Sequence, residues 1–215
     1  MNARWQAVTV PAAVVALLGG CTRHVDNPQA RPEPPAAPIT TAQVVDLLSP
    51  QVAGEEGNLF AVAEPQHCAG LAREVDPPFL DAHRPVATDG GHWTTEDGRF
   101  YIEEMVAVYR SDFDPAAALD TVRQTVDRCA GTALTVTTMQ DRTYDFAVEP
   151  FPTRAPDRAV LWSLRAADWN CDNLFVAAHN AAIEITTCGA APGFDVVTLA
   201  AEASQRIDAL ADTTA

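Results

Sequence analysis

Five cysteines carry most of the chemistry available to this chain of 215 residues. Cys21 stands alone at the end of an apolar run. The other four lie further along the chain: Cys68, Cys129, Cys171 and Cys188. Such cysteines form disulfides, ligate metals or act as redox pairs. There is no Cys-x-x-Cys motif, and the nearest histidine, His67, adjoins only one cysteine. We therefore expect two structural disulfides, no metal and no cofactor.

The segment between Cys171 and Cys188 predicts its own disulfide. If His179 and Asn180 form the two-residue loop of a β-hairpin, Cys171 faces Cys188 directly. That pairing falls on a non-hydrogen-bonded position, where Cα atoms approach to about 4.5 Å, within disulfide reach. The same register gathers four aliphatic side chains on one face: Leu174, Val176, Ile183 and Ile185. A slip of one residue would split this group and bury Glu184.

Cys68 and Cys129 remain as the second pair by elimination, one of three connectivities that four cysteines allow. In a chain-entropy model, the disulfide that closes this loop of about 60 residues stabilises the folded state by about 4 kcal/mol, and the hairpin disulfide does so by about 3 kcal/mol.

The first twenty residues read as a secretory signal that ends at a lipidation site. Arg4 gives the basic start, and the apolar core of about twelve residues is too short to span a bilayer. Leu18-Gly19-Gly20-Cys21 resembles the lipobox of bacterial lipoproteins, so Cys21 is expected to carry the lipid. The alternative is a free cysteine beside an ordinary cleavage site. We expect a signal peptide over 1–20 and a protein lipid-anchored to the cell membrane, on its extracytoplasmic face.

Residues 21–39 read as a proline-rich tether, and residues 40–215 as one domain. The prolines favour extended polyproline geometry: Pro28, Pro32, Pro34, Pro35 and Pro38. The mature chain would carry 13 arginines against 29 acidic residues, a net charge of −16. Such a surface should repel nucleic acid and anionic headgroups. The expected partners are therefore the membrane, through the N-terminal lipid, and a small-molecule or protein ligand.

The usual sequence signatures of catalysis are missing. No serine has the glycine framing of a nucleophile elbow, and there is no HExxH, Walker loop or GxGxxG. Glu103 and Glu104 are adjacent on a predicted strand, so they point to opposite faces and cannot cooperate easily; we expect a solvated, exposed face there. Three tryptophans could line a ligand pocket or fill the core: Trp93, Trp162 and Trp169.

The predicted elements alternate between helices and strands. A short helix opens with the capping-box spacing of Thr40 and Gln43 and stops before Pro50. The stretch 51–98, with Gly90-Gly91, reads as turn-rich. A strand over 99–110 places Tyr101, Glu103, Met105, Ala107 and Tyr109 on one face.

A helix then begins at Asp114-Pro115 and ends near Gly131. One face of it carries Leu119, Val122, Val126 and Cys129. Strands are predicted at 133–139, 143–149 and 159–165, and a last helix at 195–210. This order favours an α+β fold with an antiparallel central sheet flanked by helices.

The chain resembles the PknH-like extracellular sensor domain of mycobacteria over about residues 40–212. The resemblance rests on Cys68-Ala69-Gly70, on the run from Val106 to Ser111 that leads to Cys129-Ala130, and most specifically on Trp169-Asn170-Cys171 through His179-Asn180 to Cys188-Gly189. It implies two disulfides paired as above and a cleft for an extracellular ligand, but supplies no ligand-binding residues. Val126 stands where a tryptophan is frequent in the family.

The resemblance covers domains of receptor Ser/Thr kinases and free-standing lipoproteins, and the absence of a kinase segment favours the latter. We expect a lipid-anchored binding or sensor domain of the cell envelope, without catalysis. The alternative is a protein-interaction lipoprotein that supports an envelope enzyme or receptor kinase. A third reading is a hydrolase of unfamiliar type.

Overall fold

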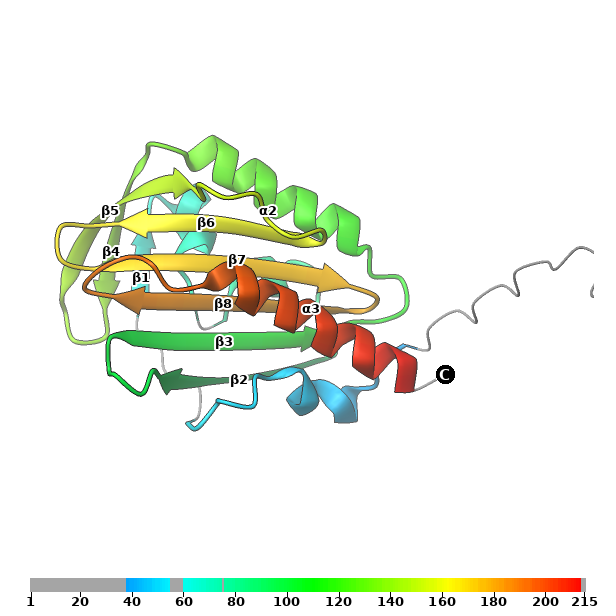
Figure 1. Ribbon diagram of the computed structural model, residues 1–215. Helices are drawn as coiled ribbons and strands as arrows, with labels where there is room; N and C mark the ends of the chain where they lie inside the picture. Colours follow the sequence, from blue (N-terminus) through cyan, green and yellow to red (C-terminus); the bar gives the residue numbers. More distant parts are fainter. Residues whose placement is uncertain (1–37, 55–59, 75, 214–215) are drawn as a thin grey trace, which may run out of the picture. The chain divides into compact units, whose positions relative to one another are not determined.

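The centre of the molecule is an antiparallel sheet. The computed structural model describes residues 38–54, 60–74 and 76–213 (Figure 1). In this part of the chain eight strands pair in the order β1-β4-β5-β6-β7-β8-β3-β2. The strands are β1 (Phe60–Glu64), β2 (Ala87–Thr94), β3 (Phe100–Val108), β4 (Ala133–Thr138), β5 (Thr143–Pro150), β6 (Ala159–Arg165), β7 (Asn170–Ala178) and β8 (Ala181–Gly189).

Helices cover both faces of the sheet. They are η1 (Thr41–Leu47), η2 (Gln66–Leu71), α1 (Pro78–Asp81), α2 (Pro115–Cys129) and α3 (Val196–Thr213), of which η1 and η2 are 3₁₀ helices. The predicted α+β class with two disulfides is confirmed. The predicted signal peptide, Cys21 and most of the predicted tether lie outside the described residues. No helix in the described part of the chain is long and apolar enough to cross a bilayer.

Strand β3 shows how the two cores are divided. Ile102, Val106 and Val108 belong to the core beneath α3 and η1. Met105, Ala107 and Tyr109 belong to the core beneath α2, η2 and α1. This alternation is the one predicted from the sequence. Because helices pack on both faces, both sets of side chains are buried.

Helix α2 begins and ends where its sequence predicts. The Asp114 carboxylate accepts hydrogen bonds from the backbone N–H groups of Ala116 and Ala117, and Pro115 occupies the first helical position. The predicted stripe of four residues, ending at Cys129, is buried. Gly131 follows with φ +75°, a conformation that glycine adopts without steric cost.

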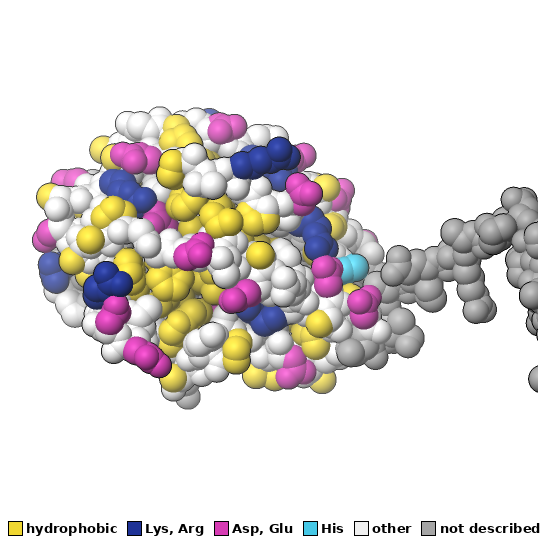
Figure 2. All heavy atoms as spheres, viewed as in Figure 1, with side chains coloured by type: hydrophobic (Ala, Val, Ile, Leu, Met, Phe, Trp, Pro, Cys, Tyr) yellow, Lys and Arg dark blue, Asp and Glu magenta, His cyan; other side chains and the backbone are white. Residues whose placement is uncertain are grey.

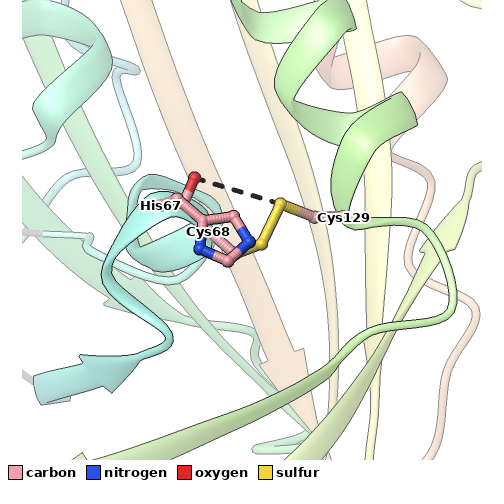
Figure 3. A group of neighbouring side chains, drawn as sticks. All are labelled: His67, Cys68 and Cys129. Atoms are coloured by element: carbon pink, nitrogen blue, oxygen red, sulfur yellow. Dashed lines mark hydrogen bonds between the residues drawn. A yellow bond between two sulfur atoms is a disulfide. The ribbon is translucent and has the colours of Figure 1, made fainter.

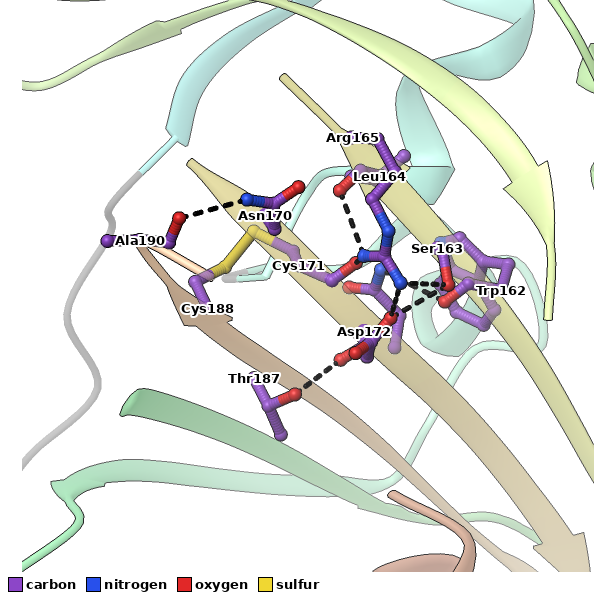
Figure 4. Close-up of polar contacts among 11 residues, drawn as sticks. Trp162, Ser163, Leu164, Arg165, Asn170, Cys171, Asp172, Thr187, Cys188 and Ala190 are labelled. Atoms are coloured by element: carbon purple, nitrogen blue, oxygen red, sulfur yellow. Dashed lines mark hydrogen bonds and ion pairs between the residues drawn. A yellow bond between two sulfur atoms is a disulfide. The ribbon is translucent and has the colours of Figure 1, made fainter. Parts of the chain in front are cut away.

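The β7–β8 hairpin has the predicted register. Cys171 faces Cys188 at a Cα–Cα distance of 4.1 Å, and the two are joined by a disulfide (Figure 4). His179 takes the positive φ of the turn, at +51°. The Asn180 side chain bonds to the backbone N–H and C=O of Ile39 and to the C=O of Tyr109. Ile39, predicted as the end of the tether, is therefore fixed in the core.

The sequence prediction was incomplete between residues 51 and 98. Strands β1 and β2 lie in this stretch, and Gly90-Gly91 is part of β2 instead of a turn. A Cβ on Gly91 would stand 2.7 Å from the carbonyl oxygen of Gly54 and 2.4 Å from Val52 Cγ1. Glycine is needed here because the segment carrying Val52 and Gly54 crosses the strand at close range.

Candidate functional site

A pocket of about 310 Å³ lies at the end of the sheet where β3 begins. Three separate turns form it: the β2–β3 turn, the β6–β7 turn and the segment after β8. Its walls are mostly apolar and are lined by Thr94, Gly98, Arg99, Phe100, Tyr101, Trp169, Ala190, Ala191 and Pro192. We call it the aromatic pocket. Apolar, aromatic concavities with a few polar groups are typical small-molecule sites.

The aromatic rings of this pocket are held in place by other rings behind them. Trp169 stacks on Tyr144 with ring centroids 6.5 Å apart, and Tyr101 stacks on His92 at 5.4 Å. The Tyr101 hydroxyl donates to Glu103 Oε2 at 2.7 Å, which fixes the ring further. Burial, followed by this contact with Glu103, raises the pKa of Tyr101. Tyr101 is therefore a neutral hydrogen-bonding group, and Trp169 offers a stacking surface.

Arg99 is the cation of the aromatic pocket, and it is already paired. Its Nε donates to Asp97 Oδ2 at 2.5 Å, and its guanidinium lies 5.7 Å from the centroid of the Phe100 ring. Hydrogen bonds from Thr95 and then Arg99 lower the pKa of Asp97 to about 2. Because this acid stays ionised, it balances Arg99 over the physiological pH range. The pocket thus favours a neutral ligand over an anion.

The pocket adjoins an apolar surface. On the other side of Arg99 and Phe100 lies a second hollow of about 410 Å³, where Phe194 meets Phe100 edge-on at 5.3 Å. Figure 2 shows hydrophobic side chains gathered beside α3, among charged side chains of both signs. Phe100, Phe151 and Phe194 are partly buried and pack against the core cluster beneath α3.

The acidic residues predicted to form an exposed face are buried, so that prediction was wrong. Glu103 and Glu104 do point to opposite faces of β3, but each face is covered, and their exposed fractions are 1% and 0%. Glu104 accepts from Arg206 of α3 at 2.5 Å and from the backbone N–H of Ser49 at 3.0 Å. It therefore anchors α3 and the segment after η1 to the sheet.

Glu184 is buried in the observed register, not only in a slipped one. Its side chain lies on the α2 side of β8, 3% exposed, and Oε2 has no hydrogen-bond partner. Burial, then the nearby Glu74 and Asp81, raise the pKa of Glu184 well above its ordinary value. Burial likewise raises the pKa of Glu74, which accepts from the backbone N–H of Phe60. Burial therefore favours the protonated, neutral form of Glu184 in the folded protein.

Glu184→Gln should therefore stabilise the protein at neutral pH. Below about pH 4 the Glu184 carboxyl is mostly protonated in both the folded and the unfolded state, so its ionisation has little effect on the free energy of unfolding. As pH rises, the unfolded chain ionises first, so wild-type stability falls until the pH passes the raised pKa of the folded state. We expect the substitution to raise the free energy of unfolding more at pH 7 than at pH 4. Urea unfolding at both pH values measures it, with the exposed Glu149→Gln as control. An equal effect at both pH values would contradict this.

The other residues singled out in the sequence divide between core and pocket. Trp93 and Trp162 are core residues, and the Trp162 indole N–H donates to the carbonyl of Leu71. Trp169 lines the aromatic pocket. Ser163 is buried, and its hydroxyl donates to Asp172, which also pairs with Arg165 (Figure 4). This buried network ties β6 to β7.

A histidine and two cysteines have potential metal-ligand atoms within 4.8 Å of one another: His67, Cys68 and Cys129 (Figure 3). The two sulfurs are joined in the disulfide between η2 and α2, with Cα atoms 6.0 Å apart. They therefore offer no thiolates to a metal. It is the only such group in the described residues.

Sequence reasoning identified Trp169 but missed the rest of the aromatic pocket. Tyr101 was predicted only as a strand residue, and Phe100 and Pro192 were not singled out as binding residues. The available signal was the position of aromatic residues at strand ends beside Gly98 and Pro192, because strand ends and their loops meet at one edge of a sheet.

Comparisons with known proteins show the family. The family described as PknH-like extracellular domain matches residues 30–214. The chain therefore belongs to the PknH-like extracellular domains, which are sensor-type and extracytoplasmic. A comparison with curated proteins finds no match.

Solved structures support the fold. The crystal structure of the extracellular domain of PknH from Mycobacterium tuberculosis is similar with a TM-score of 0.62 at 15% identity, covering 81% of this chain and 98% of that one. CalU16 from Micromonospora echinospora matches with a TM-score of 0.27 at 11% identity, covering 58% and 82%, which is too low to support an inference.

Proposed function

We propose that this protein is a lipid-anchored, non-catalytic sensor domain that binds a neutral ligand in the aromatic pocket. The single observation that carries the proposal is the pocket itself, in which Tyr101 and Trp169 are held by ring stacking. Such preorganisation reduces the entropy lost on binding. The family supports an extracytoplasmic location.

The ligand that suits this pocket is a neutral molecule with a ring, such as a saccharide unit or an aromatic group of an envelope metabolite. A sugar or aromatic ring can stack on Trp169, and a hydroxyl of the ligand can bond to the Tyr101 oxygen or to the exposed Thr94. Arg99 does not select an anion because Asp97 already pairs with it.

A thermal-shift screen tests ligand binding. The chain with Cys21→Ala, which cannot be lipidated, is heated with a panel of neutral saccharides, envelope glycan fragments and aromatic metabolites. A ligand at 100 times its Kd stabilises the folded state by about 2.7 kcal/mol. We expect at least one compound to raise Tm in a concentration-dependent manner. Silence across the whole panel would count against small-molecule sensing.

Lipid anchoring is proposed from Cys21 and its preceding residues, with a signal peptide over 1–20, a tether over 21–39 and the sensor domain over 40–215. Cys21→Ala should release the protein from the membrane fraction, because no other anchor is expected. Fractionation followed by immunoblotting measures this. Unchanged recovery in the membrane fraction would refute lipidation at Cys21.

The apolar face around Phe151 and Phe194 favours one alternative, a protein-interaction lipoprotein that serves an envelope enzyme or receptor kinase. Large exposed apolar patches mark interaction surfaces. Pull-down from envelope extracts separates the two functions, since only the alternative predicts a stoichiometric protein partner. Phe151→Ser should abolish the capture of that partner. Because Phe151 lies outside the aromatic pocket, the thermal shifts that ligands cause should persist in this variant.

A further inference from the structure

A separate pocket, of about 280 Å³, lies at the opposite end of β3 from the aromatic pocket. Its principal lining residues are His83, Arg84, Tyr109, Arg110, Asp112 and Phe113. We call it the arginine pocket. With nine residues in β3, the two pockets are about 30 Å apart along the strand. They are therefore separate sites.

The two arginines of this pocket are exposed and have no counter-ion within the part of the chain that the structure describes. The guanidinium groups of Arg84 and Arg110 make no ion pair or hydrogen bond with any described residue. The chain has 29 acidic residues for 14 arginines, so most arginines could find an acid. Other arginines do so, among them Arg123 with Asp120 and Arg158 with Asp208. Five of the eleven arginines in the described ranges pair with an acid, so an unpaired guanidinium is not unusual by itself. What distinguishes Arg84 and Arg110 is that both line the same hollow.

An aromatic frame fixes the positions of the cationic residues. Tyr109 and Phe113 stack at 4.1 Å with their planes 10° apart, and the His83 ring meets Phe113 edge-on at 5.5 Å. The Tyr109 hydroxyl donates to the carbonyl of Leu80 at 3.0 Å, so this ring is fixed both by stacking and by its hydrogen bond. Arg84 and Arg110 follow directly in sequence after His83 and Tyr109, and their backbones are therefore anchored. Arg84 also has a positive φ of +54°.

Two acids line the same pocket, and they limit its affinity for an anion. Asp114 accepts the N–H groups of Ala116 and Ala117 at the start of α2, so its charge is partly balanced and the helix terminus is already occupied. Asp112 is exposed and has no such partner among the described residues. With Asp114 balanced in this way, the two arginines outweigh Asp112.

We propose that the arginine pocket binds a phosphate-type anion through Arg84 and Arg110, with His83 as a third donor. Guanidinium groups match tetrahedral oxyanions because each can donate two parallel N–H bonds. The pocket is large enough for a phosphate ester. The anion can come from a soluble phosphorylated compound or from a lipid headgroup. The net negative charge of the chain opposes a headgroup elsewhere on the surface, and only the local excess of Arg84 and Arg110 over Asp112 favours one at this pocket.

The location of the arginine pocket is consistent with a lipid headgroup as the source of the anion. Tyr109 and Asn180 are joined by a hydrogen bond, and Asn180 holds Ile39, where the described domain begins. If Cys21 is lipidated, as proposed above, the arginine pocket lies at the end of the domain where the described chain begins, which is the end that leads to the lipid. A headgroup contact would then orient the aromatic pocket away from the bilayer.

Titration with inorganic phosphate tests the proposal. The full chain with Cys21→Ala is followed by NMR, and saturable shifts are expected at residues 83–84 and 110–113. Arg84→Gln and Arg110→Gln should each weaken binding about tenfold, the loss of a charged hydrogen-bond pair. Arg154→Gln is the matched control, because Arg154 is also exposed and unpaired but lies outside the pocket. It should change the affinity by less than about twofold.

Asp112→Asn should strengthen phosphate binding, a result that damage to the fold cannot produce. Flotation with phosphatidylglycerol vesicles separates the sources: binding that Arg84→Gln removes indicates a headgroup, and phosphate binding without vesicle binding indicates a soluble ligand. Either result supports the proposal. Absence of saturable shifts with phosphate, or an equal loss in Arg154→Gln, would overturn it.

Discussion

Replacing Arg206 with methionine is expected to lower the free energy of unfolding by about 3–5 kcal/mol. The substitution leaves the carboxylate of Glu104, which is 0% exposed, without its cation in the core beneath α3. Arg206 Nε also donates to the carbonyl of Leu47 at 2.8 Å, so the contact between α3 and η1 is lost as well. Urea unfolding followed by circular dichroism measures the change.

A matched control and a double variant separate the charge effect from helix damage. Arg158→Gln removes another arginine bound to α3, but this pair with Asp208 is about 40% exposed, and the loss should stay below about 1 kcal/mol. Combining Glu104→Leu with Arg206→Met should restore most of the stability, since a buried ion pair can be replaced by apolar packing. If the double variant is as unstable as Arg206→Met, the unpaired charge is not the cause.

Removal of the Cys68–Cys129 disulfide is expected to cost about 4 kcal/mol by the loop-entropy model. The bond closes a loop with a sequence separation of 61 and joins η2 to α2. The double variant Cys68→Ala/Cys129→Ala keeps both side chains apolar, so chain entropy dominates the loss. The hairpin bond at Cys171–Cys188, with a separation of 17, should cost less, about 3 kcal/mol.

Hydrogen exchange distinguishes a local effect from a global one. Without the Cys68–Cys129 bond, the segment with β1 and η2 should lose amide protection before β7 and β8, because β1 is an edge strand and pairs only with β4. Uniform loss of protection in all strands would contradict this order. Non-reducing peptide mapping of the wild type should show 68–129 and 171–188 links and no crossed pair.

The hairpin could be predicted from sequence because several local signals agree in it. The turn at His179-Asn180, the aliphatic pattern and the cysteine spacing all require the same register. Helix α2 was predictable for the same reason, since Asp114, Pro115 and Gly131 mark its ends. The strand predicted at 159–165 is β6, and the predicted final helix is α3.

The burial of the glutamates could not be predicted in this way. Alternation shows that Glu103 and Glu184 lie on the face away from Ile102 and Ile183, but not that a second layer covers that face. That layer is built from η2, α1 and α2, of which only α2 has a clear sequence pattern. The aromatic pocket could not be predicted either, because three turns that are far apart in sequence form it and local patterns do not show that they meet.

The most direct test of the proposed function is the affinity of the strongest compound from the thermal-shift panel for Trp169→Ala. Calorimetry should show at least a tenfold loss relative to the wild type, the size expected when an aromatic anchor of a binding site is removed. Arg154→Gln, outside the aromatic pocket, should bind as the wild type does. Equal affinity of Trp169→Ala and wild type would show that the ligand binds elsewhere and would contradict the assignment of the aromatic pocket as the sensor site.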